Sequence, residues 1–124
     1  MDRCAGQGWQ RSKPMNGRLT THVLDVSSGR PASGVRIQLF REGGLICERT
    51  TNADGRCDSP LLEGEALVSA GYELVFFIGD FFRAKGIESP FLDEVPVRFH
   101  AKAGEGYHVP LVCSPWSYST YRGS

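Results

Sequence analysis

Hydrophobic and polar residues alternate with a period of two over several short stretches of the chain. Val35, Ile37 and Leu39 fall on one face of an extended segment, and the polar residues between them fall on the other. This alternation is typical of a half-buried β-strand. The segment 95–101 alternates in the same way, and Pro96 lies near its start, where a strand tolerates a residue without an amide hydrogen. Both segments are therefore predicted to be strands.

The segment 72–78 has apolar residues on both faces, which predicts a central or interfacial strand. Further extended segments alternate with turns rich in Gly, Pro, Ser, Asn and Asp, and they cover residues 19–26, 45–51, 107–113 and 116–121. Between two of the strands, residues 79–86 favour one short helix, with Asp80 as its N-cap and Gly86 in the left-handed position after its last turn. The pattern predicts a mainly β fold, a two-sheet β-sandwich with one short helix.

Residues 1–17 follow neither the strand nor the helix period and are predicted to be a flexible N-terminal leader. The remaining residues, 18–124, fit a single domain. Nothing long or charged protects the edges of the predicted sheets, and unprotected strand edges favour pairing between chains. We therefore expect homo-oligomers.

Composition narrows the function classes. The 124 residues carry 14 Lys and Arg and 14 Asp and Glu, so the formal net charge is zero, and 40% of the residues are hydrophobic. A chain with no net charge has no excess of positive charge to attract nucleic acid or anionic lipid. No stretch reaches the roughly 18 apolar residues of a membrane span, and no apolar segment follows the N-terminal basic residues. The sequence predicts a soluble, cytoplasmic protein that binds neither nucleic acid nor membrane.

The cysteines and histidines do not form a metal-binding pattern. Their spacing matches no zinc motif, and a chain of this size does not need disulfide bonds, so free thiols and no bound metal are expected for Cys4, Cys47, Cys57 and Cys113.

Common catalytic motifs are absent: the sequence has no Gly-x-Ser-x-Gly elbow, no phosphate-binding loop and no paired carboxylates at a useful spacing. Chemistry would have to come from His, Arg and water. His22 is either a packed or solvated strand residue or a functional one, and the same choice stays open for His108 and for Arg56, which follows an Asp-Gly turn. His100 shares the polar face of its strand with Arg98 and is expected to be solvated.

Four motifs carry a family resemblance. Residues 19–25 read Leu-Thr-Thr-His-Val-Leu-Asp, residues 51–56 read Thr-Asn-Ala-Asp-Gly-Arg, and residues 79–82 read Gly-Asp-Phe-Phe. Residues 114–124 end in Tyr-Arg-Gly-Ser, a highly specific signature. With these motifs the chain resembles the 5-hydroxyisourate hydrolases, or transthyretin-related proteins.

The resemblance implies a transthyretin-like (prealbumin-like) sandwich, assembled as a homotetramer, a dimer of dimers. It also implies hydrolysis of 5-hydroxyisourate to 2-oxo-4-hydroxy-4-carboxy-5-ureidoimidazoline in urate degradation, without metal or organic cofactor. The family's functional positions correspond to catalytic His22, Arg56 and His108, with His22 and Arg56 also binding substrate. Tyr121 and Ser124 correspond to further substrate-binding positions.

A mechanism compatible with these residues uses one histidine to take a proton from water and the other to orient the water or protonate the leaving nitrogen. Arg56 would polarise the carbonyl. Tyr121 would contact the substrate ring or position Arg56, and Ser124 would fix a histidine or close the pocket. Two other functions remain open at this point: a transthyretin-like carrier of small hydrophobic ligands, and a structural or adhesive sandwich. If the source is a eukaryote, the peroxisome is an alternative location to the cytoplasm.

Overall fold

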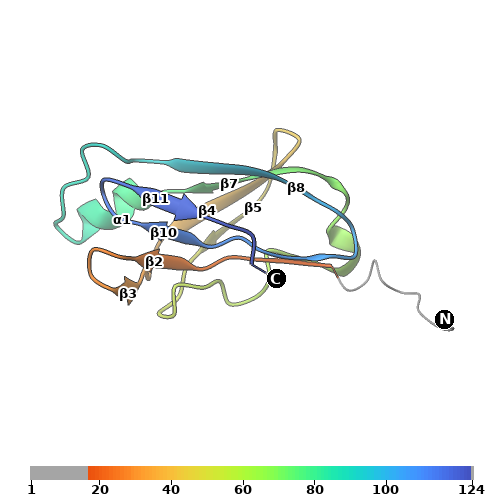
Figure 1. Cartoon of the computed structure of the whole chain (residues 1–124), viewed down its shortest axis with the longest axis horizontal. Coiled ribbons are helices and arrows are strands. Elements are labelled where there is room, and N and C mark those ends of the chain that lie inside the picture. The colour runs from red at the N-terminus through yellow and green to blue at the C-terminus, as the bar shows by residue number, and fades with distance from the viewer. Residues whose placement is uncertain (1–16, 124) are drawn as a thin grey trace, which may run out of the picture.

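The computed structural model describes residues 17–123. Most of these residues lie in strands, and Figure 1 shows them running along the long axis of the molecule. The strands are β1 (Arg18–Thr20), β2 (Val23–Asp25), β3 (Arg30–Pro31), β4 (Arg36–Arg41), β5 (Gly44–Thr50), β6 (Leu62–Glu63), β7 (Ala70–Phe76), β8 (Val95–Ala101), β9 (Gly106–His108), β10 (Leu111–Cys113) and β11 (Tyr118–Thr120). The helices are α1 (Ile78–Ala84) and a 3₁₀ turn, η2 (Gly64–Ala66).

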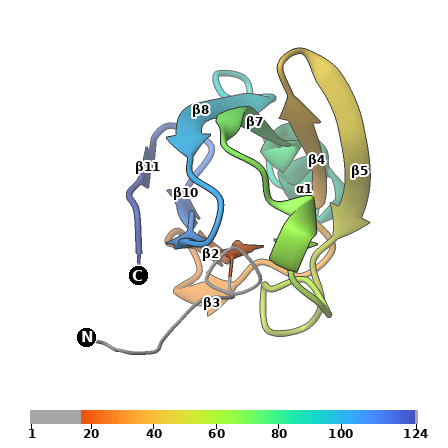
Figure 2. The same cartoon turned by 90° about the vertical axis from the view of Figure 1, so that its right-hand side faces the viewer.

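The strands form a two-layer sandwich. One layer is a four-stranded antiparallel sheet in the order β5-β4-β7-β8. The other consists of two small sheets, β6-β1-β9 and β11-β10-β2-β3, joined end to end because β1 leads into β2 and β9 leads into β10. Figure 2 looks along the sandwich and shows the two layers facing each other. Fully buried residues from both layers form the core, among them Leu19, Val23, Ile37, Leu39, Leu74, Phe76 and Leu111.

The prediction of a β-sandwich with one α-helix is confirmed. Val35, Ile37 and Leu39 are all buried, as their period of two indicated. The segment predicted to be central forms β7, which lies between β4 and β8. Strand β8 covers the predicted alternation up to Ala101, with one polar face and Pro96 as its second residue.

Two predicted strands are wrong in extent, since each is broken into two. Residues 19–26 form β1 and β2 with a break at Thr21 and His22, and residues 107–113 form β9 and β10 with a break at Val109 and Pro110. Pro110 has no amide hydrogen, so it cannot continue the ladder. The last strand is also shorter than predicted, and it covers only Tyr118–Thr120.

The helix begins earlier than predicted. Ile78 belongs to α1 and not to the preceding strand, the N-cap is Phe77, and Asp80 lies in the first turn without capping it. The predicted left-handed Gly86 after the helix is confirmed, with φ of 77°.

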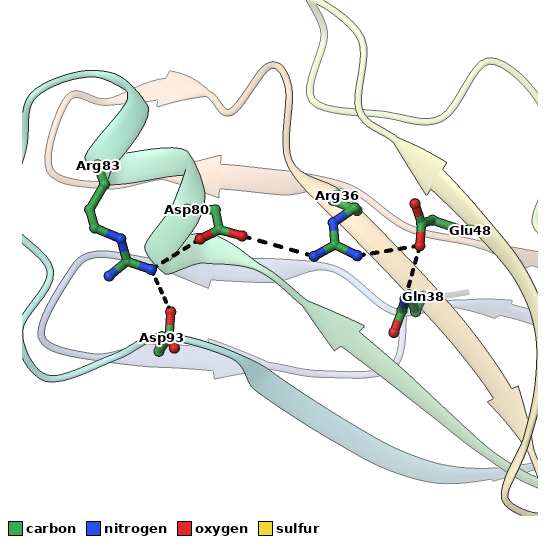
Figure 3. A network of polar contacts seen from close by, with 6 residues as sticks. All are labelled: Arg36, Gln38, Glu48, Asp80, Arg83 and Asp93. Atoms are coloured by element: carbon green, nitrogen blue, oxygen red, sulfur yellow. Dashed lines mark hydrogen bonds and ion pairs between the residues drawn. The ribbon is translucent and has the colours of Figure 1, made fainter.

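Instead of capping the helix, Asp80 takes part in an exposed chain of ion pairs. Its carboxylate lies 3.1 Å from Nη2 of Arg83 and 3.9 Å from Nη2 of Arg36. Arg83 also contacts Asp93 at 2.7 Å, and Arg36 contacts Glu48 at 3.4 Å. Figure 3 shows how this network connects α1 to β4, β5 and the loop before β8. Because all of these side chains are exposed, each pair contributes little to stability.

Some sequence predictions concern residues that the structure does not describe. Cys4, Ser124 and, apart from Gly17, the leader predicted over 1–17 lie outside the described residues. Within residues 17–123, no helix is long and apolar enough to cross a membrane, and no group of three or more His, Cys, Asp or Glu side chains could hold a metal ion.

Candidate active site

The breaks in the two long strands lie side by side. Strand β1 pairs with β9 in parallel, which places Thr20 opposite His108, and β2 pairs with β10 in the same direction. The amide of Leu111 donates to the carbonyl of His22 across the break, at 2.8 Å. Two predicted site residues from opposite ends of the sequence, His22 and His108, are therefore brought to the same region of one layer.

Thr20 orients the His108 ring. Its hydroxyl oxygen lies 2.9 Å from Nδ1 of His108. A hydrogen bond at one ring nitrogen of a histidine determines which tautomer is present and leaves the other nitrogen for chemistry. Nε2 is thus the nitrogen of His108 that is available to a reactant.

The turn over residues 52–56 brings Arg56 to the histidines. The Asn52 amide donates to the carbonyl of Arg56 at 2.7 Å, and the Asn52 side-chain oxygen accepts the amides of Asp54 and Arg56. The turn is docked on β2, because the Val23 amide donates to the carbonyl of Gly55. His22 and Arg56 form an antiparallel bridge as a result.

Gly55 is required at this docking point for two reasons. Its φ of 74° lies in the left-handed region, which favours glycine. A Cβ atom at this position would also come within 2.5 Å of the carbonyl oxygen of Val23. The Asp-Gly pair before Arg56 is therefore a structural requirement of the site.

A surface cleft of about 580 Å³ lies at this junction, and we call it the histidine cleft. Arg56 and His108 line it, whereas His22 borders it through its bridge with Arg56. The other lining residues are polar or small: Arg18, Thr20, Thr21, Cys57, Asp58, Ser59 and Pro60. A cleft of this polarity suits a small polar ligand with several hydrogen-bonding groups.

Both imidazoles in this region are shifted toward the neutral form. The pKa of His22 lies below its ordinary value of 6.5, mainly because the ring is partly buried and then because Arg56 is near, while Asp54 acts in the opposite direction. Burial also lowers the pKa of His108, and the charges of Arg56 and His22 lower it further. At neutral pH both rings are therefore neutral and able to accept a proton.

The C-terminal segment also reaches His108. The Gly123 amide donates to the carbonyl of His108 at 2.6 Å, and the His108 amide donates back at 3.3 Å. Tyr121 lies elsewhere in the single chain, in a second cleft of about 230 Å³ between β8 and the C-terminal segment. His100 lines that second cleft, is exposed and stands apart from the other two histidines, as expected of a solvated residue.

The described cysteines are free thiols. Burial, helped by the charge of Asp25, raises the pKa of Cys113 to about 12, so this thiol is inert at neutral pH. Cys57 lines the histidine cleft, and burial raises its pKa also. Neither thiol is poised as a nucleophile.

Sequence reasoning missed Thr20 and Cys57 as residues of this site. Two adjacent threonines before His22 were the only visible signal for Thr20. Threonine is common in strands, and only the register between β1 and β9 shows which of the two faces His108.

Fold and site together define the class: a transthyretin-like β-sandwich in which one histidine and an arginine line a cleft and a second histidine is bridged to that arginine. The sequence matches the HIUase/Transthyretin family over residues 19–123. The chain belongs to this family.

Individual relatives agree with this assignment. The chain is 53% identical to a 5-hydroxyisourate hydrolase of Pseudomonas aeruginosa over 122 residues, which cover 92% of this chain and 96% of that protein. A solved 5-hydroxyisourate hydrolase from Klebsiella pneumoniae is 37% identical, has a TM-score of 0.77, and the match covers 86% of this chain and 99% of that one. A solved (S)-allantoin synthase is 44% identical with a TM-score of 0.86, and the match covers 91% of this chain but only 45% of the synthase.

Proposed function

We propose that this protein hydrolyses 5-hydroxyisourate to 2-oxo-4-hydroxy-4-carboxy-5-ureidoimidazoline in urate degradation. The observation that carries the proposal is a polar cleft lined by Arg56 and His108, with His22 bridged to Arg56 beside it and the pKa of both imidazoles below 6.5. Relatives named 5-hydroxyisourate hydrolase, similar over nearly their whole length, give independent support.

In this mechanism a neutral imidazole, of His22 or of His108, takes a proton from water as the water oxygen attacks the ring carbonyl next to nitrogen. The carbon–nitrogen bond then breaks, and the leaving nitrogen receives a proton from a histidine. Arg56 presents planar, paired donors to the substrate oxygens and stabilises the negative charge that builds on the carbonyl. The reaction needs no metal or organic cofactor in this scheme.

The further residues of the proposed site are Tyr121 and Ser124, which would bind substrate. Support for Ser124 comes from its sequence neighbour Gly123, whose backbone pairs with His108. In the single chain Tyr121 lies in the second cleft, so its proposed role rests on the family resemblance.

We further propose a homotetramer, a dimer of dimers, located in the cytoplasm, or in the peroxisome if the source is a eukaryote. Exposed aromatic side chains on the described surface support assembly, since Phe91 and Trp116 stack on each other while 68% and 63% exposed. Sedimentation equilibrium should then give four times the 13.6 kDa of one chain.

The experiment that tests the function follows the ultraviolet decay of 5-hydroxyisourate, generated in place by urate oxidase, with and without the protein. Spontaneous hydrolysis supplies the baseline. Acceleration in proportion to protein concentration supports the hydrolase. Absence of acceleration by a correctly folded protein would contradict it and favour a carrier of small ligands on the same fold.

Thr20 provides a further prediction for this reaction. Thr20→Val keeps the branched shape but removes the hydroxyl at Nδ1 of His108, and we expect kcat/KM to fall about 10- to 100-fold, as for other partners that orient a functional imidazole. Thr20→Ser keeps the hydroxyl and should retain most of the activity. Steady-state kinetics of the two variants measure the difference, and equal losses in both would rule out an orienting hydrogen bond.

A further inference from the structure

The C-terminal segment continues the pairing of β11 beyond the end of that strand. Strand β11 pairs antiparallel with β10, with Leu111 opposite Thr120. His108 and Gly123 also pair antiparallel and in the same register. His108 lies three residues before Leu111, and Gly123 lies three residues after Thr120. Between these two points the ladder is interrupted at Pro110, which has no amide hydrogen to donate. Backbone hydrogen bonds resume between His108 and Gly123 beyond this gap, and a side chain provides a second attachment to β9.

Arg122 supplies that attachment through its side chain. Its Nη2 donates to the carbonyl oxygen of Gly106 at 2.9 Å and lies 3.4 Å from a carboxylate oxygen of Glu105. The guanidinium also stacks on the Tyr107 ring, 4.2 Å from its centroid. Arg122 thus holds three consecutive residues at the start of β9, directly before His108.

Tyr107 makes the attachment point rigid. Its ring is buried, and its hydroxyl donates to Glu105 while accepting the amide of Lys102. The residues that Arg122 holds are therefore fixed to the turn between β8 and β9. A guanidinium is suited to this position because it can stack and donate hydrogen bonds at the same time.

Gly123, the residue after Arg122, lies against the imidazole of His108. A Cβ atom at residue 123 would lie 3.1 Å from both Cβ and Cδ2 of His108, so the Gly123 backbone lies directly against the side chain. Thr20 holds the same ring at Nδ1. The His108 ring is thus confined by β1 at one nitrogen and by the C-terminal segment along its Cδ2 edge.

We propose that Arg122 is a positioning residue, which fastens the segment carrying Gly123 to the start of β9 and thereby fixes the orientation of the His108 imidazole. Arg122 does not line the histidine cleft, so it acts through His108 and not on the substrate. The inference rests on the proposed function for its effect on rate, but its effect on the ring can be measured separately.

The test compares Arg122→Gln with Arg83→Gln. The control removes a guanidinium of similar exposure, 48% against 55%, which pairs with Asp80 and Asp93 and does not line the histidine cleft. For Arg122→Gln we expect kcat/KM to fall 10- to 100-fold, mainly through kcat, as for other distant changes that misplace a reacting group. The pH inflection should move toward 6.5 as the His108 ring becomes better solvated. Arg122→Lys, which keeps the charge, should recover part of the loss.

Nitrogen NMR of the His108 ring gives a readout independent of turnover. Arg122→Gln should change the ring shifts and the titration of His108, while Arg83→Gln should not, and both should unfold at similar urea concentrations. Gly123→Ala, which presses a methyl group on the ring without changing any charge, should disturb the same resonances. Unchanged His108 shifts in Arg122→Gln would overturn the proposal. If the variant changes these shifts but the wild-type protein does not hydrolyse 5-hydroxyisourate, only the proposed reaction is contradicted.

Discussion

We expect Arg56→Lys to lower kcat/KM for 5-hydroxyisourate by about 10²- to 10³-fold, the usual cost of losing one donor that stabilises a developing oxyanion. Lysine keeps a positive charge at the cleft but cannot present two parallel donors to the substrate oxygens. The side chain is exposed and the turn that carries it is held by Asn52 and Gly55, so the substitution should leave the fold intact. Steady-state kinetics with urate oxidase as the substrate source measure the loss.

The pH profile separates the charge of Arg56 from its geometry. The guanidinium lowers the pKa of both His22 and His108, because a nearby positive charge disfavours the imidazolium. Removing the charge in Arg56→Gln should therefore raise both pKa values and move the rise of kcat/KM to higher pH, whereas Arg56→Lys should leave the inflection near that of the wild type. An inflection that is the same in all three proteins would show that Arg56 does not act on the histidines.

The long, regular parts of the fold could be predicted from sequence because one rule governs them. In β4 and β8 the apolar residues alternate over most of the strand and burial follows the alternation, whereas β7 is apolar on both faces and lies at the centre of its sheet. The breaks could not be predicted in this way, because the side chains keep alternating between buried and partly buried through Thr21, His22 and Val109. What ends the strands there is a change of hydrogen-bond partner, and Pro110 was the one local signal of it.

The sequence named candidate residues for the site but did not show how they lie in space. His22, Arg56 and His108 were identified by resemblance, yet their proximity depends on two features that no local pattern contains. One is the parallel register that places Thr20 beside His108, and the other is the contact of Gly55 with Val23. Tyr121 illustrates the limit, because in the single chain its side chain lies in the cleft beside β8 and not beside the histidines.

The two histidines should act as one unit, and this leads to the second large effect. We expect His108→Gln and His22→Gln each to lower kcat about 10²- to 10⁴-fold, the usual contribution of a general acid or base. The double variant should be little worse than the more damaging single one, because residues that share one proton transfer are strongly non-additive. His100→Gln is the control, since that ring is exposed in the second cleft and should keep wild-type activity.

Coupling between the rings gives this prediction a second measurement. The charge of His22 is one of the causes that lower the pKa of His108, so His22→Gln should raise the pKa of His108 toward 6.5. An NMR titration of the variant detects the shift without any substrate. If the losses in kcat instead multiply in the double variant and the His108 titration does not move, the two histidines work independently, and a mechanism in which both take part in one proton transfer would be wrong. The wild-type arrangement, in which both rings are neutral at pH 7, requires that the proton given to the leaving nitrogen be the one taken from water.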